Sequence, residues 1–287
     1  MTELAYLDGR ITAVDQARVS IDDRAFLFGD GIYEVVRSYG GVFFGLEEHM
    51  ARMARSAAAI EMELPLSEAG FVALVRELRQ KSEIDDAMVY IQVSRGVEPR
   101  RHIYDPGLKP QVLITVRHVP HIPERYWTHG VTAVTVPDIR WGMCHVKATS
   151  LMANIMAGHR ARQNGADEAI FVRDDGTVTE AYASNVFIVR DGEVWTHPLN
   201  NRILGGITRQ FVLELCSGLG VPFREAVVTR EEMRGAGEVF LTNSVHEVRA
   251  AVEIDGRPVA DGRPGPVTGR LIQAYKELVR LRTGSSE

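Results

Sequence analysis

Two segments of the chain carry residue types suited to the chemistry of amines and phosphates. Lys147 stands just before a predicted helix from about Ser150 to Asn164, whose first residues are small or apolar. An apolar environment disfavours the charged ammonium form, which would free the amine to form a Schiff base. Farther along, Gly205-Gly206 lead directly into Ile207-Thr208 at the start of another predicted helix. Amides in a first helical turn lack intrahelical partners and the helix dipole favours an anion, so this stretch predicts a phosphate cup.

Glu180 and Arg52 are candidates to bind a phosphorylated pyridine ring. Glu180 follows a predicted hairpin turn, and a carboxylate beside a pyridine nitrogen would keep that nitrogen protonated and strengthen the ring as an electron sink. Arg52 lies on a predicted helix from Leu46 to Met62, and a guanidinium grips a phosphate with two parallel hydrogen bonds. Taken singly, Glu180, Arg52 and Lys147 also fit solvated positions, and the glycine pair also fits an ordinary turn.

Arg100 and His102 stand two residues apart in an extended loop. Side chains at alternate positions of an extended segment point to the same side, so this pair is suited to bind a carboxylate. Tyr33, which follows Gly29-Asp30-Gly31-Ile32, either adds a hydroxyl donor or packs as a strand aromatic. For the Arg100–His102 pair, an ordinary surface loop is the alternative.

The composition limits the classes of protein to consider. The 287 residues are 45% hydrophobic and 25% charged, ordinary values for two modest domains or one large one. A net charge of -5 argues against a general nucleic-acid or anionic-membrane surface. Cys144 and Cys216 show neither a disulfide framework nor the spacing of a metal site. Because neither a signal peptide nor an apolar run of about 18 residues is found, we expect a cytoplasmic protein that does not enter the membrane.

Turn signals and apolar periodicity predict the elements that must position these residues. Two-residue turns predict hairpins, at Asp8-Gly9, Gly40-Gly41, Asp175-Gly176, Asp191-Gly192 and Asp255-Gly256. Caps and periodicity predict helices, over 46–62, 67–80, 150–164, 207–217 and 267–281. Further strands are expected over 87–94, 111–117, 131–136 and 240–243.

Many hairpins together with segregated helices predict an α+β fold, with two subdomains of mixed or antiparallel sheet and helices. The stretch 119–125 contains two prolines among polar residues and is predicted to be a linker. It would separate a small N-terminal α+β domain, 1–118, from a large C-terminal cofactor domain, 126–287.

Together, and in this order, the motifs resemble those of the fold-type IV pyridoxal-phosphate enzymes, from about Tyr6 to Leu281. Residues 23–34 resemble the N-terminal signature of that family, and residues 184–187 resemble a later block. The resemblance implies that Lys147 forms the Schiff base with pyridoxal 5'-phosphate and that Glu180 is the partner of the pyridine nitrogen. It implies further cofactor contacts, from Leu204 at the ring and from Arg52, Ile207, Thr208 and Ser244 at the phosphate.

Within this family, Arg100 and His102, completed by Tyr33, resemble the carboxylate trap of D-amino-acid transaminases. In that group the trap reaches over from the neighbouring subunit, so the resemblance implies a homodimer. It also implies ping-pong transfer of an amino group from a D-amino acid such as D-alanine to 2-oxoglutarate or pyruvate, with Lys147 moving the α-proton. Branched-chain L-amino-acid aminotransferases, (R)-amine transaminases and aminodeoxychorismate lyases are the alternatives. A non-enzymatic cofactor carrier would leave the trap without a purpose.

Several residues depart from the pattern of the D-amino-acid transaminases. Tyr182 and Ala183 stand where those enzymes carry small hydroxyl residues, and Asn243 replaces a serine before Ser244. Arg101 lies inside the trap motif, where it would compete for a carboxylate. These departures bear on the substrate range rather than on the use of the cofactor.

Overall fold

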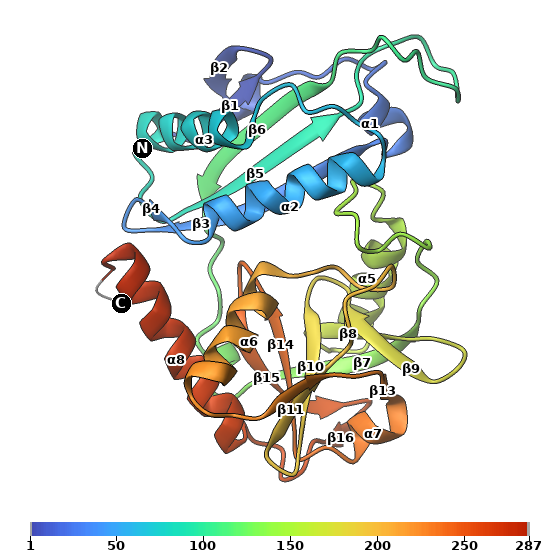
Figure 1. Ribbon diagram of the computed structural model, residues 1–287, viewed down its shortest axis with the longest axis vertical. Helices are drawn as coiled ribbons and strands as arrows, with labels where there is room; N and C mark the ends of the chain where they lie inside the picture. Colours follow the sequence, from blue (N-terminus) through green and yellow to red (C-terminus); the bar gives the residue numbers. More distant parts are fainter. Residues whose placement is uncertain (1, 286–287) are drawn as a thin grey trace. The chain divides into compact units, whose positions relative to one another are not determined.

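An antiparallel sheet organises the first part of the chain in the computed structural model, which describes residues 2–285 (Figure 1). The strand order is β2-β1-β6-β5-β3-β4. The strands are β1 (Leu4–Leu7), β2 (Arg10–Ala13), β3 (Gly31–Tyr39), β4 (Val42–Phe43), β5 (Ala87–Ser94) and β6 (Gln111–His118). Asp8 and Gly9 both have positive φ, as the tight turn between β1 and β2 requires. The predicted hairpins at Asp8-Gly9 and Gly40-Gly41 are therefore confirmed.

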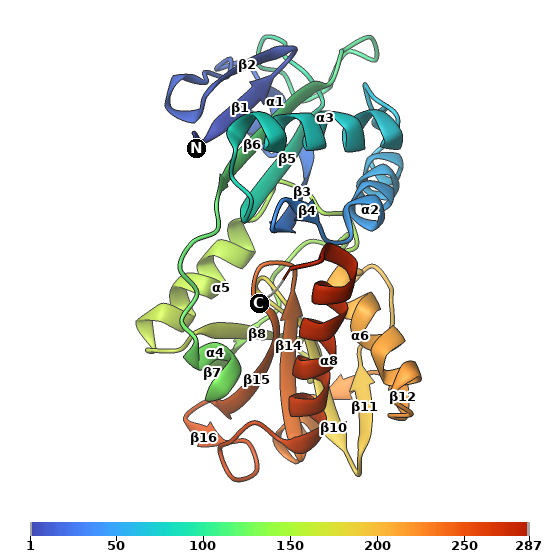
Figure 2. The ribbon, with the colours of Figure 1, turned by 90° about the vertical axis from the view of Figure 1, so that its left-hand side faces the viewer.

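Two helices, α2 (Leu46–Ala59) and α3 (Glu68–Ser82), cover one face of this sheet (Figure 2). The Ser67 hydroxyl accepts a hydrogen bond from the Gly70 amide at 3.1 Å, which confirms the predicted cap of α3. The prediction that α2 reaches Met62 was wrong, because the chain leaves the helix after Ala59 and Glu61 has a φ of 52°. A short helix, α1 (Arg24–Phe28), and a 3₁₀ turn, η1 (Val14–Gln16), complete this part.

A mixed sheet organises the second part of the chain. Its strands are β7 (Val131–Pro137), β8 (Glu168–Val172), β9 (Thr177–Ala181), β10 (Asn185–Arg190), β11 (Glu193–Thr196), β12 (Phe223–Glu225), β13 (Val228–Thr229), β14 (Glu238–Asn243), β15 (Glu247–Ile254) and β16 (Arg257–Pro258). β7 runs parallel to β8 and β15, whereas most other pairs are antiparallel. Strands β10-β14-β15-β7-β8-β9 close into a ring, because β9 pairs with β10 through Glu180 and Asn185. The predicted α+β class with mixed and antiparallel sheets is confirmed.

The second part of the chain also contains helices. They are α4 (Arg125–Thr128), α5 (Met152–Gln163), α6 (Ile207–Gly218), α7 (Arg230–Arg234) and α8 (Pro266–Thr283). α5 packs on β7 and β8, and α6 packs on β12 and β14. Helices α1, α4 and α7 were not predicted, since four or five residues are too few to show a helical period. Within residues 2–285, no helix is long and apolar enough to cross a bilayer.

The packing divides the chain into two units. Unit 1 comprises Met1–Pro120, Val146–Leu151 and Val279–Glu287, of which residues 1, 286 and 287 lie outside the described part. Unit 2 comprises His121–His145 and Met152–Leu278. The chain first passes from unit 1 to unit 2 between Pro120 and His121, which lie within the expected linker 119–125. Two short segments expected in the second domain, 146–151 and 279–285, pack with unit 1 instead.

Candidate active site

The segment that carries Lys147 is bound to the edge of strand β3 in unit 1. Ala148 pairs with Ile32 in an antiparallel bridge, and the Tyr33 amide donates to the Lys147 carbonyl at 2.9 Å. The Lys147 amide donates to the Ser56 hydroxyl at 3.2 Å. Lys147 Nζ lies 4.3 Å from the centroid of the Tyr33 ring. These contacts hold the amine beside β3, although the two segments are far apart in the sequence.

A glycine makes this close docking possible. Gly29 has a φ of +68°, and a Cβ at this position would lie 3.0 Å from the Ser150 Cβ. Thr149 donates its amide to the Gly31 carbonyl and its hydroxyl to the Gly29 carbonyl, both at 2.9 Å. Any other residue at position 29 would strain the backbone and push segment 146–151 away from β3.

Glu34, the next residue along β3, forms a buried cluster with His49 and Arg52 of α2. Arg52 Nε and Nη2 donate to the two Glu34 oxygens at 2.8 and 2.7 Å, and His49 Nδ1 lies 2.7 Å from Glu34 Oε2. Burial alone would raise the pKa of Glu34, but the charges and hydrogen bonds of Arg52 and His49 more than offset this and lower that pKa. Burial lowers the pKa of His49 despite the opposing charge of Glu34. Glu34 therefore fixes the direction of the Arg52 guanidinium, which is only 5% exposed and does not lie on a solvated helix face.

In unit 2, Glu180 of β9 is buried and hydrogen-bonded through both carboxylate oxygens. Oε1 is paired with Arg140, and Oε2 accepts from Asn185 Nδ2 at 3.1 Å and from the Leu204 amide at 3.0 Å. Asn185 Nδ2 also donates to the Leu204 carbonyl at 2.8 Å. The ion pair favours the ionised carboxylate, which is the form able to hold a proton on a pyridine nitrogen.

Arg140 links Glu180 to a second carboxylate, that of Asp138. Its Nε and Nη2 each donate to Asp138 at 2.9 Å, and Nη2 also donates to Thr179 Oγ1 at 3.1 Å and to the Arg202 carbonyl at 3.0 Å. Burial alone would raise the pKa of Asp138, but the hydrogen bonds and charge of Arg140 lower it. Burial disfavours the charge of Arg140, yet the two carboxylates raise its pKa. The guanidinium therefore holds Glu180 in position and places a positive charge beside it.

The predicted phosphate cup is the N-terminus of α6. Gly206 is the N-cap residue and contributes no capping side chain, so the first-turn amides of Ile207 and Thr208 point out of the helix without a side-chain cap. A Cβ at Gly206 would lie 2.1 Å from Asn185 Oδ1, so a larger residue there would displace the Asn185 side chain from its hydrogen bonds to Glu180 and to the Leu204 carbonyl. The Thr208 hydroxyl lies 3.4 Å from the Tyr275 hydroxyl. First-turn amides without a side-chain cap, directly after two glycines, suit a phosphate group.

Ser244 begins the turn between β14 and β15, and Asn243 organises that turn. Asn243 Oδ1 accepts from the amides of Val245 and His246 at 3.0 and 2.6 Å. Its Nδ2 donates to the Ser184 hydroxyl at 2.9 Å. The asparagine that departs from the family pattern is therefore a turn-forming residue in this chain.

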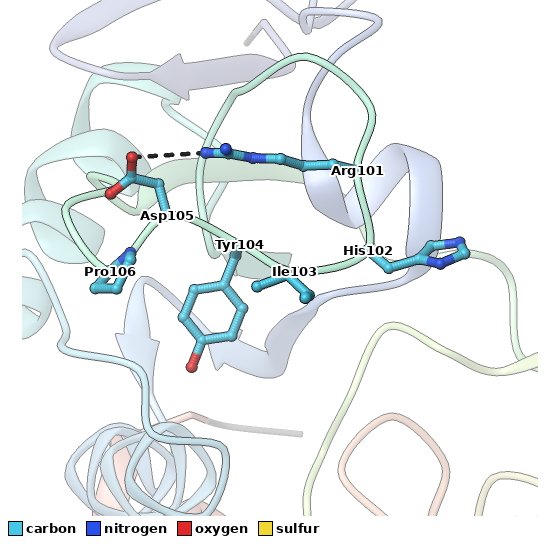
Figure 3. Close-up of a pocket in the computed structure, with 6 residues that line it drawn as sticks. All are labelled: Arg101, His102, Ile103, Tyr104, Asp105 and Pro106. Atoms are coloured by element: carbon cyan, nitrogen blue, oxygen red, sulfur yellow. Dashed lines mark ion pairs between the residues drawn. The ribbon is translucent and has the colours of Figure 1, made fainter.

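Two of the other three departures, Tyr182 and Arg101, also have defined partners. The Tyr182 ring packs on α5, where a Cβ at Gly158 would come within 3.0 Å of it. Arg101 is bound to Glu98 at 2.5 Å and lies 3.5 Å from Asp105. Figure 3 shows the Arg101 side chain running along its own loop toward Asp105. The Arg101 guanidinium, which was predicted to compete for a carboxylate, is thus paired with two carboxylates of its own loop.

The structure brings the predicted trap residues Arg100 and His102 together at Phe28. Arg100 Cζ lies 5.4 Å from the centroid of the Phe28 ring, and the His102 ring lies 5.9 Å from it. Both trap side chains are exposed. Tyr33, predicted to complete the trap, stacks on Tyr90 with ring centroids 5.5 Å apart.

Glu34, His49, Asn185 and Arg140 were given no role from the sequence. Glu34 had a signal that could have been used, since it is a carboxylate at an inward position of the apolar strand β3. Arg140 follows Asp138 by two residues in an extended segment, which is a weak sign of a shared side. Their partners come from other segments, so no local pattern points to these contacts.

The sequence and the structure of this chain are similar to those of known proteins. Residues 31–254 match the family described as amino-transferase class IV. The chain is 39% identical to a D-alanine aminotransferase from Bacillus licheniformis, over 97% of this chain and 98% of that protein. A branched-chain amino acid aminotransferase from Escherichia coli has a similar structure, with a TM-score of 0.91 and 26% identity over 99% of this chain and 96% of that one. A branched-chain amino acid aminotransferase from T.th., solved with pyridoxamine 5'-phosphate, has a TM-score of 0.90 and 26% identity, covering 98% of this chain and 95% of that one.

Proposed function

This chain belongs to the class IV aminotransferase family, and from this premise we propose that it transfers the amino group of D-amino acids, such as D-alanine, to a 2-oxo acid. It is a pyridoxal-phosphate-dependent enzyme. The proposed acceptors are 2-oxoglutarate and pyruvate. The observation that carries the choice of a D-amino acid is the 39% identity, over 97% of the chain, to a D-alanine aminotransferase.

The candidate residues of unit 1 and those of unit 2 each have side chains or amides suited to parts of the cofactor. When bound, pyridoxal phosphate supplies an aldehyde that condenses with amines and a pyridinium ring that withdraws electrons from the substrate α-carbon. Lys147 Nζ would hold the aldehyde carbon, and Glu180 would bind the pyridine nitrogen. Leu204 would pack on the ring, its backbone fixed by Glu180 and Asn185. The phosphate ligands would be the first-turn amides of α6 and the side chains of Thr208, Arg52 and Ser244.

Proton transfer is assigned to Lys147 Nζ. In this proposal the amine acts first as a general base, which takes the proton from the α-carbon of the amino acid. It then acts as a general acid, which gives that proton back later in the same half-reaction. The Tyr33 ring lies beside Nζ and limits where the amine can reach. Glu180, paired with Arg140, would hold the ring nitrogen in its protonated form.

Arg100 and His102 are assigned to the substrate α-carboxylate, together with the Tyr33 hydroxyl. Gripping the carboxylate on one side fixes which face of the α-carbon is presented to Lys147, and so it selects one enantiomer. Because Arg100 and His102 are exposed on the single chain, we propose that they act on the active site of a second copy in a homodimer. Light scattering of the purified holoenzyme would test this state. A cytoplasmic location completes the proposal.

A branched-chain L-amino-acid aminotransferase is the second candidate, because the solved structures of similar fold carry that description. The two candidates differ in the hand of the substrate. We would record the visible spectrum of the purified holoenzyme and add D-alanine, L-alanine and L-leucine separately, with no acceptor. Bleaching of the cofactor band by D-alanine alone supports the proposal. Bleaching by the L-isomers alone would assign the chain to the second candidate.

A further inference from the structure

One buried arginine holds the loop that carries the carboxylate trap. Residues 97–106, here called the trap loop, connect β5 toward β6 without helix or strand of their own. Arg24, in α1, donates from Nη1 to the Arg101 carbonyl at 2.8 Å and from Nη2 to the His102 carbonyl at 3.1 Å. Its Nη1 also donates to Glu98 Oε1 at 2.9 Å. Arg24 is 4% exposed, so these bonds are made away from solvent.

The same guanidinium is held by a second carboxylate outside the loop. Arg24 Nε donates to Asp30 Oδ2 at 2.8 Å. Asp30 also accepts from Arg95 Nε at 2.9 Å, and Arg95 Nη2 donates to the Ile60 carbonyl, just past the end of α2, at 2.9 Å. The trap loop is thereby connected, through Arg24 and Asp30, to the helical layer of unit 1.

Arg24 also contacts the aromatic ring on which the trap side chains rest. Its Cζ lies 5.0 Å from the Phe28 centroid, and Arg100 Cζ and the His102 ring contact the same ring. Arg24 therefore fixes the two peptide groups on either side of the His102 Cα, and it also contacts the Phe28 ring beside the trap side chains. Only a guanidinium offers several planar donors in fixed directions, so lysine cannot replace these contacts.

We propose that Arg24 is the positioning residue of the carboxylate trap, and that it sets the affinity for the substrate α-carboxylate by fixing the trap loop. The inference rests on the proposed function, since it assigns to Arg24 the placement of Arg100 and His102. Arg24 touches neither substrate nor cofactor in this assignment. Its effect should therefore appear in binding of the amino acid and not in the chemical step.

The test is the Arg24→Lys variant of the full-length holoenzyme, followed in a stopped-flow half-reaction with D-alanine. We expect the apparent Kd for D-alanine to rise by about tenfold, as for the loss of one charge-assisted hydrogen bond. The limiting rate should stay within about twofold of the wild type, because the groups at the α-carbon are unchanged. Amide hydrogen exchange across the trap loop should become faster. Glu98→Gln, which weakens the same anchor, should shift the Kd in the same direction and serves if Arg24→Lys does not fold.

A double-mutant cycle with Arg100→Ala separates positioning from a general loss of stability. If Arg24 acts through the trap, Arg24→Lys should change the Kd little further once Arg100 is removed. Arg230→Lys is the matched control. Arg230 donates hydrogen bonds to Asp255 and Thr135 in unit 2, each at 2.8 Å, and neither partner is a candidate site residue. It should leave the half-reaction unchanged.

Two results would overturn the inference. One is a wild-type Kd for D-alanine in Arg24→Lys, or in Glu98→Gln if Arg24→Lys does not fold. The other is an effect that adds in full to that of Arg100→Ala, which would make Arg24 a purely structural residue. A wild-type enzyme that does not react with D-alanine would instead refute the proposed function, and this inference with it.

Discussion

Replacing Arg140 by methionine should remove the counter-charge of two buried carboxylates. In the wild type its guanidinium bridges Asp138 and Glu180, and the side chains of the three residues are 3–8% exposed. The variant keeps a long side chain in the same space, so the main loss is electrostatic. Asp138 and Glu180 would then be buried without their shared cation.

The size and the pH dependence of the effect follow from this geometry. Breaking a buried ion pair by removing one partner costs about 3–5 kcal/mol, which corresponds to a Tm lower by on the order of 10 °C. Arg140 lowers the pKa of Asp138, so this carboxylate stabilises the wild type above its unfolded pKa, and the contribution is lost as pH falls through the folded pKa. In the variant burial dominates and raises that pKa, so the carboxylate destabilises the fold at high pH. The difference in Tm should therefore be largest near pH 8 and should shrink toward pH 5.

The assay is thermal unfolding of wild type and Arg140→Met between pH 5 and pH 8, with transaminase activity at each pH. Arg230→Met is the control, because the pair formed by Arg230 and Asp255 is partly exposed and such pairs contribute about 0–1 kcal/mol. Activity should also fall, since Glu180 loses the partner of Oε1. A Tm for Arg140→Met equal to that of the wild type at pH 8, or a difference that does not change with pH, would refute the electrostatic reasoning.

Three further changes test other parts of the site. Lys147→Ala should remove nearly all turnover and the visible band of the bound cofactor; near-normal activity would exclude Lys147 as the covalent residue. Gly206→Ala places a Cβ 2.1 Å from Asn185 Oδ1 and should weaken cofactor affinity by about tenfold in a fluorescence titration. Gly218→Ala, at the other end of α6, is the control: its Cβ would have no atom within 4 Å, and the affinity should not change. Glu34→Gln removes the charge that faces a buried guanidinium and should cost about 3–5 kcal/mol in urea unfolding; a loss below about 1 kcal/mol would show that the pair is not electrostatically important.

Local patterns were sufficient to predict most elements of the fold. The turns at Asp8-Gly9, Gly40-Gly41, Asp191-Gly192 and Asp255-Gly256 predicted hairpins because two-residue loops need positive φ at both central positions, which all four have. At Asp175-Gly176 only the glycine has positive φ, and the loop between β8 and β9 is longer. Ser67 predicted the start of α3 because a side-chain oxygen is needed for the free amides there. The order of the motifs also indicated the family and its cofactor, since each motif is short and continuous.

Only the tertiary structure decided how the site residues are held. The Tyr33 amide of β3 binds the Lys147 carbonyl. Arg52 is oriented by its hydrogen bonds to Glu34, and Glu180 forms an ion pair with Arg140. Each of these pairs joins segments that are distant in the sequence, and a single buried charge carries no periodic signal that would reveal its partner. Residue types and local spacing therefore determined which chemistry the chain can perform. The direction and the charge state of each group were set by burial and by ion pairs that form only when the chain is folded.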